Sequence, residues 1–219
     1  GNNVVLNGFD LELFEGENLV VMGKSGSGKS VMIKCVIGLE QPDSGSILVM
    51  NEEINKLEQE ALDELRTEIG FLFQGSALYD SMSVRENLEF PLRRHTKKFG
   101  VIEDTTPLVM EALESVGLAH AIDLMPNELS GGMKQKLALS CALIHKPSVL
   151  FLDEPTTGVD PVSRKEFWGI LKNLKAQGIT ILVSTPYMDE ASLCDRIALI
   201  QNGQFLKIDT PKNIVKQYE

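Results

Sequence analysis

The sequence predicts an α/β fold in which a buried parallel sheet is covered by helices on both faces and a mainly helical segment is inserted. Apolar runs such as Leu19–Met22 and Val149–Leu152 alternate with helical patterns, which is typical of strands buried on both sides. Between about 75 and 145 the strand signal disappears and only helical patterns remain. We expect one domain of 219 residues, with a sheet core over 1–74 and 146–219 and a helical subdomain over 75–145.

The first 74 residues predict four strands and two helices. Phe9–Phe14 alternates apolar and acidic side chains, which is typical of a half-exposed strand. Pro42–Gly45 is a turn, and Gln74 ends the last strand of this part. The other predicted elements are a strand over 19–22, a helix over 31–37, a strand over 46–50, a helix over 58–66 and a strand over 69–73.

The remaining residues predict a helical segment followed by renewed strand and helix alternation. Ser83–Glu86 has the form of a capping box and opens a helix that we expect Pro91 to disrupt. Pro107–Gly117 has a helical apolar stripe with Pro in its first turn and Gly at its end. Later elements are a helix over 133–145, a strand over 148–152, a helix over 162–176, a strand over 180–183, a helix over 187–194, two strands between 196 and 208, and a helix that begins at Thr210.

The segment Gly23–Ser30 lies between a strand and a helix and fits the pattern G-x-x-x-x-G-K-[ST] at every fixed position. Its glycines let the backbone wrap around phosphate oxygens, and the helix N-terminus adds N–H groups. Lys29 would bring its charge to the β- and γ-phosphates, and the Ser30 hydroxyl would ligate Mg²⁺. We expect this segment to bind ATP; the alternative is a flexible Gly/Ser turn. Lys24 is either a further phosphate contact or a solvated side chain, and we favour the second. The residues assigned to ATP are Gly23, Ser25, Gly26, Ser27, Gly28, Lys29, Ser30 and Gln74.

Two carboxylates, Asp153 and Glu154, directly follow the buried strand 149–152. Ligands of open α/β sheets lie beyond the carboxyl ends of the strands, where the phosphate loop also lies. Asp153 is therefore expected to organise Mg²⁺, and Glu154 to polarise the attacking water as a general base. Gln74 either reaches Mg²⁺ and that water or is an ordinary polar strand end. An Asp-Glu pair at a strand end is also common on protein surfaces.

A second anion-binding helix N-terminus is predicted at Leu129–Met133, where a serine and two glycines open an amphipathic helix. One loop cannot lie on both sides of the same nucleotide. A second subunit is the simplest arrangement that lets both loops contact ATP.

These motifs occur in the order and spacing of the ATPase domains of ATP-binding cassette (ABC) transporters, which the chain resembles over essentially its whole length. The resemblance implies a P-loop NTPase (RecA-like) core with a small antiparallel β subdomain. It also implies a head-to-tail homodimer in which each ATP lies between one subunit's phosphate loop and the other's signature loop. The resemblance implies that Ser130, Gly131 and Gly132 contact the γ-phosphate of the ATP bound by the partner. It implies that Glu154 is the general base and that Gln74 links the metal to the transporter. It also implies that Asp160 contacts the opposite subunit.

Three features depart from the family pattern. The fifth signature residue is Met133 where Gln is usual. Pro186 occupies the switch position of the family's histidine, so the γ-phosphate contact is lost or is replaced by Thr185. The family's adenine-stacking aromatic normally precedes a segment like Asn2–Leu6, and we expect this chain to begin after it. These departures keep open a nucleotide-binding module with weak or no turnover.

The two parts of the chain also resemble different subfamilies. Residues up to about 128 resemble the ATPase of Mla-type phospholipid transporters, and residues from about 134 resemble drug-export ATPases. Acidic side chains outnumber basic ones in the first part only. A recombined or engineered chimera is therefore a hypothesis, which a continuous natural gene would refute. The resemblance rests on Phe73–Tyr79 and Leu88–Arg93 in the first part and on Lys134–Leu139 and Tyr187–Ala191 in the second.

The composition limits the partners. A net charge of −10 argues against a broad nucleic-acid footprint. No apolar run approaches a membrane span, and no signal peptide is visible, so we expect a cytoplasmic protein held on the membrane by its partners. Three separated cysteines are expected to be buried thiols.

The leading interpretation is the ATP-hydrolysing motor of a transporter, with Gln74–Arg94 contacting membrane subunits. The apolar residues of that segment are alternatively core residues of the helical part. A soluble, non-transport ABC ATPase is the competing class.

Overall fold

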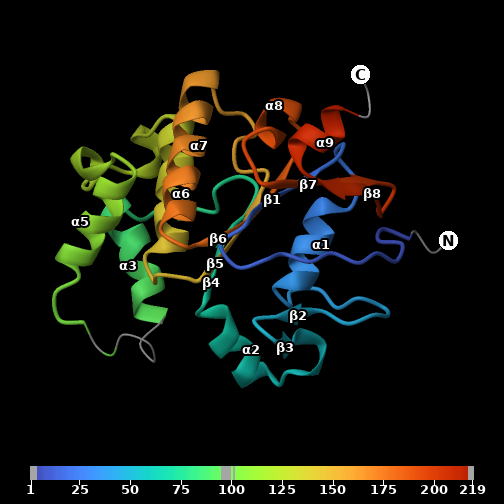
Figure 1. Cartoon of the computed structure of the whole chain (residues 1–219). Coiled ribbons are helices and arrows are strands. Elements are labelled where there is room, and N and C mark those ends of the chain that lie inside the picture. Colours follow the sequence, from blue (N-terminus) through green and yellow to red (C-terminus); the bar gives the residue numbers. More distant parts are fainter. Residues whose placement is uncertain (1–3, 95–99, 101, 217–219) are drawn as a thin grey trace.

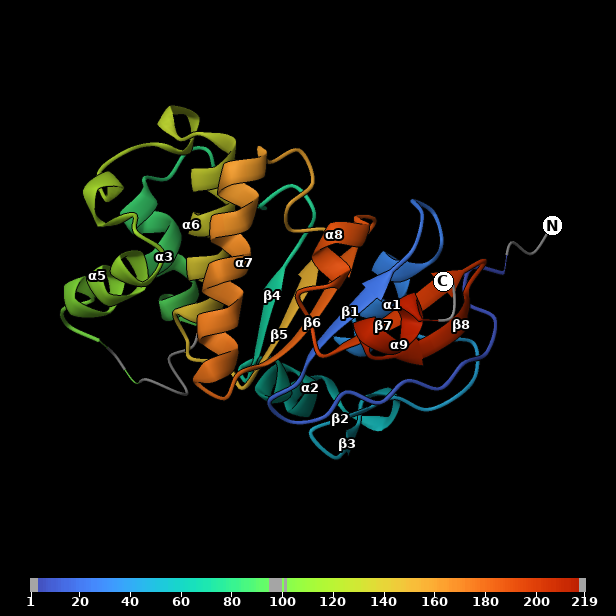
Figure 2. The same cartoon turned by 45° about the horizontal axis from the view of Figure 1, so that its top comes forward.

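A computed structural model describes residues 4–94, 100 and 102–216, with Arg94 described by its backbone alone (Figure 1). Asn2 and Asn3, which belong to the N-terminal resemblance, lie outside the described residues. The predicted fold class is confirmed: a mainly parallel sheet carries helices on both faces, and a separate group of helices packs beside it (Figure 2).

Six strands form the main sheet in the order β4-β5-β6-β1-β7-β8. The first five are parallel, and β8 runs antiparallel to β7 at one edge. Every residue of β1 and β6 is buried, as continuous apolar runs predict for central parallel strands. The strands are β1 (Asn18–Met22), β4 (Ile69–Leu72), β5 (Val149–Asp153), β6 (Thr180–Thr185), β7 (Arg196–Gln201) and β8 (Gln204–Asp209). A small antiparallel sheet pairs β2 (Leu48–Val49) with β3 (Glu52–Glu53).

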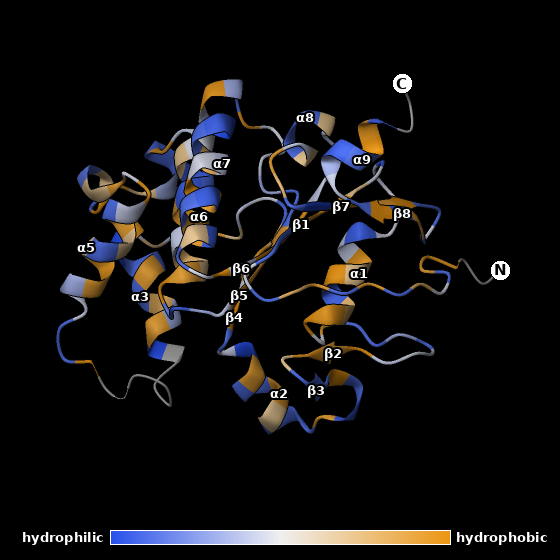
Figure 3. Ribbon diagram, in the orientation of Figure 1, coloured by the Kyte–Doolittle hydropathy of each residue, from blue (hydrophilic) through white to orange (hydrophobic). Residues whose placement is uncertain are grey.

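The side chains of β1 alternate between two hydrophobic cores. Leu19 and Val21 pack with residues of the helices α1 and α2, whereas Val20 and Met22 pack with residues of α6 and α7 on the opposite face. Figure 3 shows the apolar residues along these central strands. The covering helices are α1 (Lys29–Val36), α2 (Gln59–Arg66), α6 (Gly131–Leu143), α7 (Pro161–Ala176), α8 (Met188–Ala191) and α9 (Pro211–Val215).

A third core joins α3 (Val84–Arg94), α5 (Thr106–Ser115) and α6. On α6, Leu137 belongs to this helical core and Ala138 belongs to the sheet core, so α6 connects the two parts. Short 3₁₀ turns lie at Ile54–Lys56, Ala119–Ala121 and Pro126–Glu128. None of the helices in the described ranges is long and apolar enough to cross a membrane.

The predicted strand at Phe9–Phe14 is wrong, because this segment has no regular secondary structure. Its polar backbone groups bind side chains: the Phe14 N–H donates to Glu17, and the Glu12 carbonyl accepts from Arg196. Phe9 packs edge-on against Phe205 of β8, with ring centroids 4.5 Å apart. The alternating polarity of Phe9–Phe14 arises because one side of this segment is half-buried, although its backbone pairs with no strand of the described residues.

The expected disruption at Pro91 is also wrong, because α3 continues through it. Proline cannot donate to the carbonyl four residues earlier, which belongs to Asn87. The Cys141 thiol on α6 donates to that carbonyl instead, with a sulfur–oxygen distance of 3.5 Å. The predicted capping box is present: the Ser83 N–H donates to Glu86 over 2.7 Å, and the Glu86 N–H donates to Ser83 Oγ over 3.3 Å.

Candidate nucleotide-binding site

The loop Gly23–Ser30 joins β1 to α1, and two of its positions require glycine. A Cβ at Gly23 would lie 2.4 Å from the carbonyl oxygen of Ile200 on β7. Gly28 has a φ of +101°, and a Cβ there would lie 2.9 Å from Leu6 Cδ2. The loop is therefore held against the sheet on one side and the N-terminal segment on the other.

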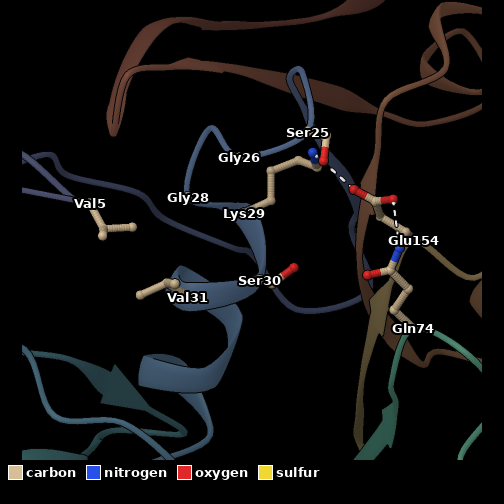
Figure 4. Close-up of a pocket in the computed structure, with 9 residues that line it drawn as sticks. All are labelled: Val5, Ser25, Gly26, Gly28, Lys29, Ser30, Val31, Gln74 and Glu154. Atoms are coloured by element: carbon tan, nitrogen blue, oxygen red, sulfur yellow. Dashed lines mark hydrogen bonds and ion pairs between the residues drawn. The ribbon is translucent and has the colours of Figure 1, made fainter. Parts of the chain in front are cut away.

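Lys29, the first residue of α1, is only 3% exposed. Its ammonium group donates to the carbonyl oxygens of Gly23 at 2.9 Å and Lys24 at 3.1 Å. It also forms an ion pair with Glu154 Oε1 at 3.1 Å, which Figure 4 shows across the mouth of the loop. The ammonium thus has three oxygen partners, and Lys24 is solvent-exposed.

Glu154 directly follows β5 and has a left-handed backbone with a φ of +48°. Its N–H donates to Ser184 of β6, to the carbonyl oxygen at 3.1 Å and to the hydroxyl at 3.0 Å. Its second carboxylate oxygen accepts from Gln74 Nε2 at 3.4 Å and from the Thr157 hydroxyl at 3.2 Å. The ends of β4 and β5 and the start of α1 therefore bring Gln74, Glu154 and Lys29 together.

These three side chains line a pocket of about 160 Å³. Ser25, Gly26, Gly28 and Ser30 of the loop, which the sequence assigned to ATP, also line it. Its lining includes Val5 and Val31, which sequence reasoning missed because single valines carry no binding signal. The lining residues are Val5, Ser25, Gly26, Gly28, Lys29, Ser30, Val31, Gln74 and Glu154.

Of the residues assigned to ATP or Mg²⁺ in the same chain, Gly23, Ser27 and Asp153 do not line this pocket. Gly23 packs against β7, and Ser27 is 7% exposed with no hydrogen-bond partner for its hydroxyl in the described structure. Asp153 is 5% exposed, and its carboxylate accepts from the Ser184 hydroxyl at 2.6 Å. Ser184 therefore holds both Asp153, the last residue of β5, and Glu154, which follows it.

The oxygen donors at the pocket fit Mg²⁺. Mg²⁺ prefers oxygen ligands and is usually held by one or two protein groups together with substrate phosphates and water. Ser30 and Gln74 offer a hydroxyl and an amide oxygen in the pocket lining, and Asp153 is a nearby carboxylate at the end of β5. Within the described residues, no group of three or more His, Cys, Asp or Glu side chains forms a metal cage.

The signature residues lie at a different place, at the start of α6. Ser130 caps this helix by accepting from the Met133 N–H at 3.2 Å. Ser130 and Gly131 are exposed, and Gly132 is buried against Ser163 of α7, whose Oγ would lie 2.4 Å from an added Cβ. None of the three signature residues lines the pocket of its own chain.

Asp160 caps the neighbouring helix α7. Its Oδ1 accepts from the N–H groups of Val162 and Ser163, each at 3.0 Å. Hydrogen bonds from Ser163 and then Val162 hold the pKa of Asp160 below its usual range. The two helix N-termini that carry Gly132 and Asp160 are thus packed together.

Pro186 is exposed and directly follows β6. The neighbouring Thr185 is fully buried; its hydroxyl donates to Glu190 and accepts from the Tyr187 N–H. The alternative that Thr185 replaces the histidine contact therefore does not fit this arrangement, because its hydroxyl is engaged inside the protein. Tyr187 stacks with Arg164 of α7, whose Cζ lies 4.1 Å from the ring centroid.

Comparison with known proteins identifies the family. Residues 6–157 match the family model described as ABC transporter. The chain is 37% identical over 203 residues to the probable multidrug ABC transporter ATP-binding protein YbhF of Escherichia coli K12. The aligned residues make up 92% of this chain and 34% of YbhF. It is 38% identical over 216 residues to the methionine import ATP-binding protein MetN 4 of Oceanobacillus iheyensis, covering 98% of this chain and 62% of that protein. The chain thus spans about a third of the first relative and under two thirds of the second.

Solved structures give the same assignment. A dimeric, post-hydrolysis structure of the ATP-binding cassette MJ0796 bound to ADP and Pi superposes with a TM-score of 0.87 at 30% identity, covering 94% of this chain and 90% of that one. The structure of cbiO1 from Clostridium perfringens, part of an ABC transporter complex, also gives a TM-score of 0.87 at 30% identity. It covers 98% of this chain and 85% of its own.

Proposed function

The chain belongs to the ABC transporter family of ATP-binding proteins, and on this premise we propose that it is the ATP-hydrolysing subunit of a membrane transporter. The observation that carries the proposal is the convergence of Lys29, Glu154 and Gln74 at the phosphate loop. A buried cation beside a glycine loop suits a triphosphate, and a carboxylate opposite it suits the activation of water.

In the proposed reaction, Lys29 exchanges its ion pair with Glu154 for a phosphate oxygen of ATP. Glu154 then accepts a proton from the water whose oxygen bonds to the γ-phosphorus, while the bond from that phosphorus to the bridging oxygen of the β-phosphate breaks and ADP leaves. Gln74, which contacts the Glu154 carboxylate, orients this group. Ser30, Gln74 and Asp153 would hold Mg²⁺, which supplies positive charge to the β- and γ-phosphates when bound. The remaining loop residues, including Gly23 and Ser27, would shape the phosphate cradle.

We propose that a second copy of this chain completes the site. Ser130 and Gly131 are exposed at the N-terminus of α6, Gly132 is buried beside them, and none of the three lines the pocket of its own chain. Such an N-terminus attracts anions, so it would contact the γ-phosphate of a partner in a head-to-tail homodimer. Asp160, which packs beside Gly132, would contact the opposite subunit. The solved MJ0796 cassette, a relative in structure, is dimeric.

We propose that the surface beside Gln74 binds the membrane subunits, which would hold the chain at the cytoplasmic face of the membrane. Phe73 and Tyr79 are 38% and 46% exposed, respectively, whereas Leu88 and Leu92 of α3 are buried. Leu88 and Leu92 therefore belong to the helical core, and the two exposed aromatic residues form the candidate contact. We propose that the chain is divided into two parts: a sheet core over 1–74 and 146–219, and a helical subdomain over 75–145. This division would let the surface move with the helices.

Steady-state hydrolysis of ATP with excess Mg²⁺ tests the proposal. We expect the chain to hydrolyse ATP, and we expect Glu154→Gln to lower the hydrolysis rate about 100- to 10,000-fold while ATP binding remains. Chelation of Mg²⁺ should have the same effect on turnover. Glu111→Gln, which changes an exposed glutamate on α5 in the same way, is the matched control. Unchanged hydrolysis in Glu154→Gln would exclude the assigned general base.

One observation favours a second candidate function, a nucleotide-binding module with weak or no turnover. Pro186 provides neither an imidazole nor an N–H, and the hydroxyl of Thr185 is occupied. ATP binding by the unaltered chain without measurable hydrolysis would support this second function.

A further inference from the structure

Glu190 on α8 is a buried carboxylate that has no role in the proposed reaction. Its side chain is 1% exposed. Its Oε1 accepts from the Thr156 hydroxyl and its Oε2 from the Thr185 hydroxyl, each at 2.5 Å. The Arg164 Nε lies 3.6 Å from Oε1 and is the cation that faces it. Burial of a carboxylate is costly unless it is hydrogen-bonded and paired, and Glu190 meets both conditions.

The two threonines connect Glu190 to the loop that carries Glu154. Thr156 lies two residues after Glu154, in the turn that follows β5, and is 1% exposed. Thr185 is the last residue of β6 and directly precedes Pro186. One carboxylate therefore joins the turn after β5 to the segment after β6.

The turn needs such support because Glu154 has a left-handed backbone, with a φ of +48°. This conformation is unfavourable for a residue with a side chain and persists only where its surroundings fix it. Ser184 fixes the turn on its N-terminal side through two hydrogen bonds to the Glu154 N–H. Glu190 fixes it on the C-terminal side through Thr156.

We propose that Glu190 is a positioning residue, which holds the Glu154 carboxylate in place for ATP hydrolysis by clamping Thr156 to the end of β6. The inference rests on the proposed function, in which Glu154 is the general base. It assigns to Glu190 the link between the hydrolytic carboxylate and the Pro186 segment. Lys29 and the phosphate loop make no hydrogen bond to Glu190 in the described structure, so we expect that loss of the clamp does not weaken ATP binding.

Kinetics of Glu190→Gln and Thr156→Val test the clamp. We expect kcat for ATP hydrolysis to fall about 10- to 100-fold, because a displacement of about 1 Å at a reacting group has effects of this size. Neither the KM for ATP nor the dissociation constant of a non-hydrolysable ATP analogue should rise more than about 2-fold, since the phosphate loop keeps its own residues and contacts. Thr156→Ser keeps the hydroxyl and should restore kcat. Asp189→Asn is the matched control, because this neighbouring carboxylate is 73% exposed and pairs with Arg164 without contacting Thr156.

A second measurement separates positioning from a general structural role. In the Glu154→Gln background, Glu190→Gln should have no further effect on the residual hydrolysis rate, because Glu190 acts through Glu154. A further loss there, or a parallel loss of ATP affinity, would assign Glu190 a structural role and overturn the inference. Unaltered kcat in both Glu190→Gln and Thr156→Val would also overturn it. If Glu154→Gln alone leaves hydrolysis unchanged, the proposed function itself is wrong. If Glu190→Gln fails to fold, Thr156→Val and its serine rescue decide the question.

Discussion

Lys29 Nζ lies 3.1 Å from Glu154 Oε1, so the cation proposed to bind phosphate and the carboxylate proposed to activate water neutralise each other. Both side chains are largely buried, with 3% and 10% exposure. A buried pair of this kind is weakly screened by solvent, and each partner is costly to leave alone. A phosphate group that binds Lys29 would therefore compete with Glu154, which would couple nucleotide binding to release of the proposed general base.

This competition predicts that Glu154→Gln binds nucleotide more tightly. The amide keeps a hydrogen-bond acceptor near Lys29 but no longer offers a negative charge. We expect the affinity for a non-hydrolysable ATP analogue to rise about 10-fold, roughly the size of one charge-assisted hydrogen bond. Isothermal titration calorimetry at a low chain concentration measures this change. An unchanged or weaker affinity would show that the ion pair does not oppose binding.

Lys29→Ala should remove nucleotide binding, whereas Lys24→Ala should preserve it. Lys29 is buried at the start of α1, and its loss leaves the phosphate charge without its cation. We expect a loss of ATP affinity of about 100-fold or more, because hydrogen bonds to charged groups contribute about 1.5–3 kcal/mol each. Lys24 is exposed and serves as the matched control. Equal affinities for the two variants would contradict the phosphate-loop assignment.

Ser83→Ala should destabilise the helical part of the chain. The Ser83 hydroxyl accepts from the Glu86 N–H, and its own N–H donates to the Glu86 carboxylate. Loss of a serine N-cap lowers the free energy of unfolding by about 1 kcal/mol. Urea unfolding followed by circular dichroism gives the change. Ser81→Ala, two residues earlier on an exposed position, should leave the midpoint unchanged; an equal shift in both variants would contradict the cap.

The cysteine thiols should react slowly in the folded chain. Burial raises the pKa of Cys141 to about 12 and the pKa of Cys194 to about 12, and it also raises the pKa of Cys35. Because the thiolate is the reactive form, little of it exists in the folded chain at about pH 8. Reaction with Ellman's reagent should accelerate at least about 10-fold on unfolding in urea. Folded-state reactivity of Cys141 and Cys194 should still be rising at pH 9.0, the ordinary pKa of a thiol, because burial raises both pKa values to about 12. Rapid, complete reaction of the folded chain would be inconsistent with this burial.

Sequence patterns predicted the features that local chemistry determines. The buried strands, the phosphate loop, the Ser83 capping box and the Thr210 cap each depend on residues within one short segment. The strand at Phe9–Phe14 was wrong because the pattern cannot show that Glu17 and Arg196 bind its backbone.

Features that depend on distant segments were missed for the same reason. Pro91 is tolerated because Cys141, which lies on another helix, donates to the carbonyl of Asn87. Glu190 lies in a short helix beside Asp189, and its sequence context is that of a solvated acid. Its burial arises only where Thr156 and Thr185 meet it from two other segments.

The central claim is that two copies of this chain share each hydrolytic site, and a mixing experiment tests it most directly. Lys29→Ala and Ser130→Arg should each be inactive alone, because each removes one half of both sites. In an equal mixture, the mixed dimers combine an intact phosphate loop with an intact signature loop, so hydrolysis should return to about a quarter of the unaltered rate. Unaltered chain diluted with excess Lys29→Ala is the control that measures whether one intact site per dimer is sufficient. Recovery of hydrolysis in the mixture is the predicted result; no recovery, in a system where the control retains activity, would contradict the shared site.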